Sequence, residues 1–111
     1  MGGYILSIDQ STSATKAMLF DEQGSLHARE SVSHHQYYPR EGFVEHDAEE
    51  IYRNALSAMR GCFAKSGLDE SELAAVAITN QRETVLVWDR DTGEPIAHAA
   101  VWQCLRGREI C

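Results

Sequence analysis

Residues 4–21 read YILSIDQSTSATKAMLFD, and this stretch decides the fold. Two runs rich in β-forming residues, Tyr4–Asp9 and Thr15–Asp21, enclose a short polar loop, so the pattern predicts a β-hairpin. The loop combines a carboxylate, hydroxyls and a lysine. Such a tip can hold a metal-bound polyphosphate, because the carboxylate orients Mg²⁺ while hydroxyls, backbone N–H groups and the lysine bind phosphate oxygens. A plain Ser/Thr-rich turn favours the same residues and is the alternative for this segment alone.

Size and charge restrict the class of protein. The chain has 111 residues, the length of one domain, and a formal net charge of -7, which argues against a nucleic-acid or anionic-membrane partner. It has no apolar run of the roughly 18 residues that a membrane span needs, and no signal peptide is predicted. Three cysteines without a C-x-x-C pair argue against a disulfide scaffold or a zinc site, so we expect a cytoplasmic protein.

After the hairpin, the sequence predicts a third strand and then a loop. Leu26–Ser33 alternates weakly and follows a glycine turn, which indicates a strand near an edge. His34–His46 is aromatic and polar and is interrupted by Pro39 and Gly42, so we expect a loop there. Its histidines lack the spacing of metal ligands and are expected to be solvated.

A helix is predicted next. Asp47 is a good N-cap with Glu50 three residues later, as in a capping box, and Gly67 is suited to the residue that ends the helix. One apolar face recurs at helical spacing and consists of Ile51, Ala55, Ala58, Met59 and Cys62.

The last third predicts more strands. Leu73–Thr79 is almost continuously apolar, which is typical of a strand covered on both faces. Val85–Trp88 and Ile96–Trp102 read as a hairpin, with Trp88 in the core or in hairpin packing, and a new helix is expected to open at Arg106. The order β-β-β-α-β predicts an α/β fold with a mixed sheet and helices against it. It matches the start of a ribonuclease-H-like half-domain of the actin/hexokinase/Hsp70 type of ATPase, here incomplete.

Four stretches occur in an order and at spacings that together carry a resemblance. They are Asp9–Lys16 (DQSTSATK), Gly42–Asp47 (GFVEHD), Asn80–Thr84 (NQRET) and Ala100–Arg106 (AVWQCLR). In this order they resemble the N-terminal domain of the FGGY carbohydrate kinases, over essentially the whole chain from Tyr4 to Cys111. The resemblance implies ATP and Mg²⁺ as cofactors, and transfer of the γ-phosphoryl group to a terminal hydroxyl of glycerol or a related polyol.

The resemblance also implies which residues face the nucleotide. The phosphate-binding candidates are Asp9, Gln10, Ser11, Thr12, Ser13 and Lys16, with Asp9 implied to hold the metal through water. Ser11 stands where the family has glycine, so the backbone there must accept a side chain. Ala14 replaces a serine of the family.

The same comparison implies a polyol side. Arg82 can donate to substrate hydroxyls in fork geometry and Glu83 can accept from them, while the flat indole of Trp102 suits the C–H faces of a polyol. The alternatives are an Arg–Glu surface pair and a core tryptophan. Cys104 and Leu105 replace an Asp-Arg pair of the family, which leaves a related polyol or sugar open as the substrate.

Two parts of a kinase are not found in the sequence. Phosphoryl transfer needs a base near the attacking hydroxyl and a second phosphate-binding wall, and neither Asp89 nor Asp91 matches a base position. We therefore expect residues 1–111 to be the N-terminal part of the first kinase domain, inactive alone and homo-oligomeric at full length. The alternative is a stand-alone, non-catalytic binding module of the same fold. If the chain is a fragment, the apolar faces of Leu73–Thr79 should be exposed. If it is a stand-alone module, they should be covered.

Overall fold

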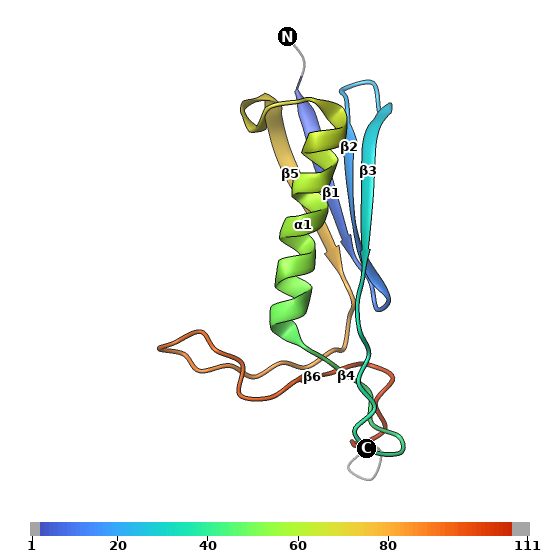
Figure 1. Ribbon diagram of the computed structural model, residues 1–111, viewed down its shortest axis with the longest axis vertical. Coiled ribbons are helices and arrows are strands. Elements are labelled where there is room, and N and C mark those ends of the chain that lie inside the picture. Colours follow the sequence, from blue (N-terminus) through green and yellow to red (C-terminus); the bar gives the residue numbers. More distant parts are fainter. Residues whose placement is uncertain (1–2, 108–111) are drawn as a thin grey trace.

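The computed structural model describes residues 3–107 as a four-stranded sheet with one helix across one face and a small two-stranded pairing beyond its end (Figure 1). The elements are β1 (Tyr4–Gln10), β2 (Ala14–Phe20), β3 (Leu26–Ser33), β4 (Glu45–His46), α1 (Ala48–Ser66), a short 3-10 helix (Glu70–Glu72), β5 (Leu73–Asn80) and β6 (Ala99–Ala100). The predicted order β-β-β-α-β is therefore confirmed.

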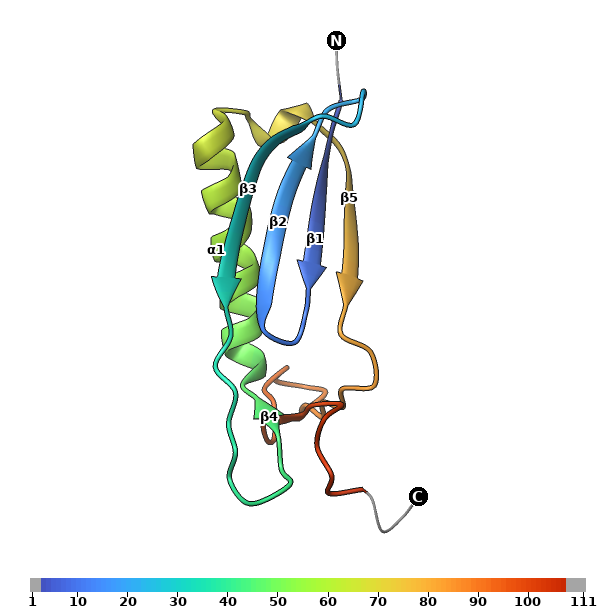
Figure 2. The same cartoon turned by 90° about the vertical axis from the view of Figure 1, so that its right-hand side faces the viewer.

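The order of strands in the main sheet is β3-β2-β1-β5, with β5 parallel to β1 and the other neighbours antiparallel. Asp9 on β1 lies opposite Lys16 on β2 and opposite Thr79 on β5. Because β1 and β5 run the same way, their carboxyl ends meet at one edge of the sheet (Figure 2). This places the hairpin tip next to the residues that follow β5.

The ends of α1 follow from local chemistry. The carboxylate of Asp47 accepts a hydrogen bond from the Glu49 backbone N–H at 3.0 Å, and Gly67 ends the helix with a left-handed φ of 72°. The predicted capping box is wrong, because the Glu50 carboxylate turns to the His35 backbone N–H at 3.0 Å instead. Within residues 3–107 no helix is long and apolar enough to cross a membrane.

The core lies between α1 and the face of β1, β2 and β3 that it covers (Figure 1). Small side chains on the helix, Ala58 and Cys62, are both fully buried and allow the helix to approach the sheet closely. The buried cluster consists of Leu6, Ile8, Ala17, Leu19, Ala28, Ala58 and Cys62. The predicted apolar face of the helix is thus the one that packs, with Ala58 and Cys62 at its centre.

Strand β5 lies outside the cover of the helix. Val76 and Ile78 are paired in register with the buried Leu6 and Ile8, yet they are 52% and 70% exposed. The prediction of a strand covered on both faces is therefore wrong for this chain, because α1 packs over β2 and β3 and leaves β5 uncovered. This exposure is what the fragment hypothesis expects.

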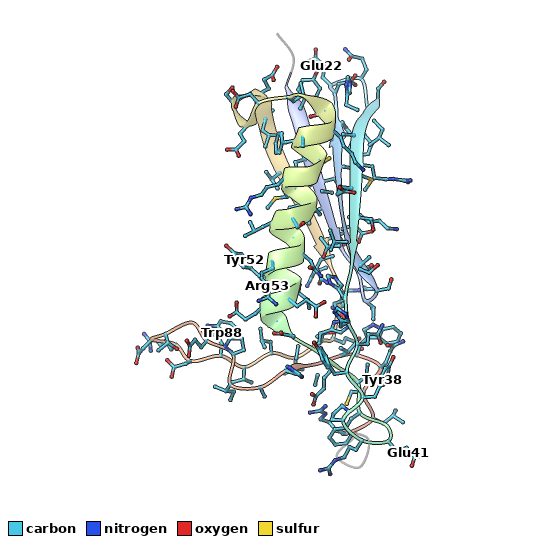
Figure 3. All side chains as sticks on the ribbon, in the orientation of Figure 1. Glu22, Tyr38, Glu41, Tyr52, Arg53 and Trp88 are labelled. Carbon is cyan, nitrogen blue, oxygen red and sulfur yellow. The ribbon has the colours of Figure 1, made fainter. Side chains whose placement is uncertain are left out.

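The last third has fewer strands than predicted. Val85 and Ala100 form a single bridge, as do Trp88 and Pro95. After β5, within residues 81–107, only Ala99–Ala100 forms a strand, which pairs with β4 rather than with a hairpin partner. The segment projects from the sheet, and Trp88 lies on this arm, 57% exposed and not in the core (Figure 3). The loop predicted over residues 34–46 ends in β4, and the helix expected at Arg106 is a turn at residues 106–107, with 108–111 outside the described residues.

Candidate functional site

A cleft of about 460 Å³ opens at the edge where β1 and β5 end. Its lining combines the hairpin tip, the residues that follow β5 and one distant aromatic ring: Asp9, Gln10, Ser11, Thr12, Asn80, Gln81, Arg82, Glu83 and Trp102. Seven of the nine residues predicted for the site meet here. Ser13 and Lys16 are exposed and are not part of the lining.

The hairpin tip accepts a side chain at Ser11 without backbone strain. Both the backbone N–H and the hydroxyl of Ser11 donate to the Ala14 carbonyl, at 2.9 and 2.8 Å, which closes the turn. Among the residues that the structure describes, Glu83 is the only non-glycine residue with a positive φ. Serine in place of the family glycine is therefore compatible with this loop, since no left-handed conformation is required there.

Asp9 and Lys16 lie opposite each other on β1 and β2, on the face of the sheet away from α1, because their neighbours Ile8 and Ala17 point into the core. Neither takes part in an ion pair among residues 3–107. The same residues contain no cluster of three potential metal ligands. A single free carboxylate suits Mg²⁺, which usually keeps several waters and takes further oxygens from phosphates.

The polyol candidates Arg82 and Glu83 are both exposed at the cleft. They form no ion pair with each other among the described residues, so the surface-pair alternative is not realised. Glu83 has a φ of 64°, a left-handed conformation that costs a residue with a side chain about 1–2 kcal/mol. Strain of this kind gathers at ligand-binding positions, where the surrounding structure maintains it.

Trp102 is 52% exposed, so the core alternative is wrong. Its indole N–H donates to the Thr12 hydroxyl oxygen at 2.8 Å, which connects the last stretch of the resemblance to the first. The ring therefore forms one wall of the cleft beside the hairpin tip.

Three further side chains, which were not predicted as site residues, support Trp102. The Trp102 backbone N–H donates to the Thr84 hydroxyl at 3.3 Å, and this hydroxyl donates to the Gln81 side-chain oxygen at 3.0 Å. The Gln81 amide nitrogen lies 3.1 Å from His46 Nδ1. Gln81 and Thr84 flank the predicted Arg82-Glu83 pair, and this position in the sequence could have indicated their role. His46 is 35 residues from Gln81, and nothing in the sequence indicates that the two are in contact.

Two histidines predicted to be solvated are packed behind the cleft. His46 is 0% exposed and its Nε2 has no hydrogen-bond partner within residues 3–107, while its ring lies 5.8 Å from that of His34. His34 Nε2 lies 3.0 Å from the Thr15 hydroxyl, and its Nδ1 lies 2.9 Å from the Asn54 amide. Burial lowers the pKa of both rings, and the neighbouring His34 lowers the pKa of His46 further. Only His35, whose side chain is 81% exposed, fits the prediction.

Comparison with known proteins now decides the family. The sequence profile of the "FGGY family of carbohydrate kinases, N-terminal domain" matches residues 4–111. The chain belongs to this family. It is 54% identical to glycerol kinase 1 of Thermotoga maritima over 97% of its own length, and 50% identical to the glycerol kinase of Saccharopolyspora erythraea over 99%. It spans 22% of the length of each of these relatives.

Solved structures give the same result for the fold. The glycerol kinase of Plasmodium falciparum with ADP superimposes with a TM-score of 0.82 at 37% identity, over 98% of this chain and 22% of that one. A structure described as a "xyloylose kinase" from Brucella ovis gives a TM-score of 0.89 at 19% identity, over 96% of this chain and 22% of that one, a likeness that shows the fold alone. The predicted ribonuclease-H-like partial domain is thus confirmed.

Proposed function

We propose that these residues form the phosphate side and the polyol side of the cleft of an ATP-dependent polyol kinase, with glycerol as the favoured acceptor. One observation carries the proposal: the cleft unites the tip of the first hairpin with Arg82, Glu83 and Trp102. Glycerol is favoured because the relatives at 54% and 50% identity are glycerol kinases. A related polyol or sugar is the second candidate, since Cys104 and Leu105 depart from the family pattern.

On the phosphate side, the roles follow from the chemistry of the side chains. ATP, the proposed co-substrate, supplies the γ-phosphoryl group, in agreement with a solved relative that holds ADP. Asp9 would hold Mg²⁺ through water, while Gln10, Ser11 and Thr12 line the cleft and can donate hydrogen bonds to phosphate oxygens. Ser13 and Lys16 lie outside the lining, so we propose that they contact the more distant part of the polyphosphate.

On the polyol side, Arg82 would donate to the hydroxyl oxygens of the acceptor and Glu83 would accept from hydroxyl protons. The exposed indole of Trp102 would cover the C–H face of the carbon chain. Paired donors and acceptors beside an apolar ring distinguish a polyol from water, and they hold a terminal hydroxyl toward the phosphate side of the cleft.

The base and the second phosphate-binding wall would come from outside residues 3–107. The carboxylate of Asp89 accepts hydrogen bonds from the backbone N–H groups of Asp91 and Thr92, which is the role of a turn residue. We therefore propose that the chain is the N-terminal part of the first kinase domain. The exposed β5 and the 22% share of the relatives' length support this assignment. The cytoplasmic location and the homo-oligomeric state stay predictions.

The test is ATP-dependent phosphorylation by the full-length gene product, with glycerol, erythritol and a pentitol as acceptors. Replacing Arg82 with alanine should weaken glycerol binding by about 1.5–3 kcal/mol, because charge-assisted hydrogen bonds are lost. Arg90→Ala, on the exposed arm, is the matched control and should leave glycerol binding unchanged. Absence of phosphorylation with all three acceptors, or equal effects of the two variants, would refute the proposal.

The stand-alone module is the second candidate. The uncovered Val76 and Ile78 argue against it, because a self-sufficient domain rarely leaves an apolar strand open. Light scattering on the 111-residue chain separates the two. A stable monomer at high concentration would favour the module, and self-association would favour the kinase segment.

A further inference from the structure

The hydrogen bond between Thr12 and Trp102 joins two residues that are 90 positions apart, one on each side of the proposed cleft. At 2.8 Å it is short for an N–H donor and a hydroxyl acceptor. Thr12 lies on the phosphate side and Trp102 on the polyol side, so this contact crosses from one substrate region to the other.

The backbone of Trp102 is fixed independently of that contact. The preceding residue, Val101, is 2% exposed and its N–H donates to the Val44 carbonyl at 3.0 Å, while the N–H of Trp102 itself donates to Thr84. With the backbone held, the ring retains only its two side-chain torsions. A single hydrogen bond at the edge of the indole, from Nε1, is therefore sufficient to set the plane of the ring.

A threonine hydroxyl has one proton to donate and two lone pairs to accept with. Here one lone pair accepts the indole N–H, which leaves the proton free to donate to another oxygen. Phosphate oxygens are acceptors, so a nucleotide phosphate can use that proton without displacing the tryptophan. Each of the two hydrogen bonds polarises the hydroxyl in the direction that strengthens the other.

Resting on the proposed function, we infer that Thr12 is a positioning residue for Trp102 and that its hydroxyl makes nucleotide binding and polyol binding reinforce each other. The nucleotide side then influences the polyol wall through one side chain, in addition to any movement of domains. By thermodynamic linkage the effect is reciprocal, so polyol should also raise the affinity for nucleotide.

The contact itself is tested by ¹⁵N NMR on the 111-residue chain, which has two tryptophans. Trp88→Phe removes the other tryptophan, so the indole signal of Trp102 is the only one that remains. In that background Thr12→Val should move the signal and speed its hydrogen exchange, while Thr12→Ser should restore both. An indole signal that does not change in Thr12→Val overturns the inference.

The coupling is tested by polyol titration of the full-length gene product without nucleotide. Thr12→Val should weaken polyol binding by about 2- to 10-fold, the range for one lost hydrogen bond, and Thr12→Ser should recover most of it. Trp102→Phe keeps an aromatic ring but removes the indole N–H, so the double variant Thr12→Val/Trp102→Phe should lose no more than Trp102→Phe alone. The control Thr92→Val makes the same change at the distant turn and should have no effect.

The outcomes separate this inference from the function on which it rests. If Thr12 is a phosphate ligand only, Thr12→Val leaves polyol affinity without nucleotide unchanged, and the inference is overturned while the kinase assignment stands. If wild-type protein binds no polyol, both are overturned, and the indole signal then reports only a structural contact.

Discussion

The two histidines behind the cleft, one buried and one half-buried, predict that the chain loses stability under mildly acidic conditions. The pKa of His46 and that of His34 lie below their ordinary value of 6.5, chiefly because burial disfavours the charged ring. In the unfolded chain these two rings take up protons near pH 6.5, whereas in the folded chain they do so only at lower pH. The unfolded state therefore binds more protons in this window, and the free energy of unfolding falls as the pH falls.

The magnitude has an upper limit that follows from the titration of the unfolded state. Between about pH 7.5 and about pH 5.5, one histidine that stays neutral in the folded state removes about 1.4 kcal/mol. His46 is fully buried and should approach this limit, whereas His34 is half-buried and should contribute less. We expect a total loss of about 2 kcal/mol. The carboxylates with lowered pKa values, such as Asp21 and Glu50, contribute little in this window, because their ordinary pKa values of 3.8 and 4.5 already lie below it.

The assay is urea unfolding of the 111-residue chain across that pH range, with circular dichroism as the signal. His46→Asn is the diagnostic variant, because its amide oxygen can accept from Gln81 in place of Nδ1 but cannot titrate. It should remove the larger part of the pH dependence. Gln23→Asn, which changes an exposed amide that does not titrate, is the control and should leave the pH dependence intact. A His46→Asn chain with the parent's pH dependence would refute the reasoning.

Two further predictions concern folding. Glu83→Gly should raise the free energy of unfolding by about 1 kcal/mol, since glycine adopts the φ of 64° without a side-chain clash, while polyol affinity in the full-length gene product falls. A loss of stability in urea unfolding would show that no strain is stored at this position. Leu19→Ala, at a fully buried position, should cost about 2–5 kcal/mol, whereas Leu26→Ala, at a position 50% exposed, should cost less than about 1 kcal/mol in the same assay. Similar costs for the two leucines would contradict the assignment of the core.

The parts of the fold that could be predicted from the sequence are those with a local cause. The β-forming runs in residues 4–21, the N-cap at Asp47 and the helix-ending Gly67 each act within a few residues, and the structure confirms them. The burial of β5 could not be predicted in this way, because it depends on what covers Val76 and Ile78 rather than on their own apolarity. Val85–Trp88 has strand-forming residues but lacks a continuous partner, so only isolated bridges form.

The same distinction between local and long-range causes applies to the candidate site. Asp9, Arg82 and Trp102 were predicted through the resemblance to the family, and the structure brings them to one cleft. The contact between Gln81 and His46 spans 35 residues, and no periodicity or spacing in the sequence indicates such a contact. The burial of His46 was missed because a histidine before an N-cap reads as part of a polar loop.

The open edge of β5 has a consequence for synthesis of the protein. On the proposal that later residues cover β5, a ribosome that adds about 5–20 residues per second leaves this strand uncovered for seconds after it leaves the exit tunnel. During that time β1 already offers β5 a complete parallel ladder, while Val76 and Ile78 remain in contact with solvent. The nascent chain then has a folded hairpin and helix beside an exposed apolar edge strand. Chaperones bind apolar surface of this kind.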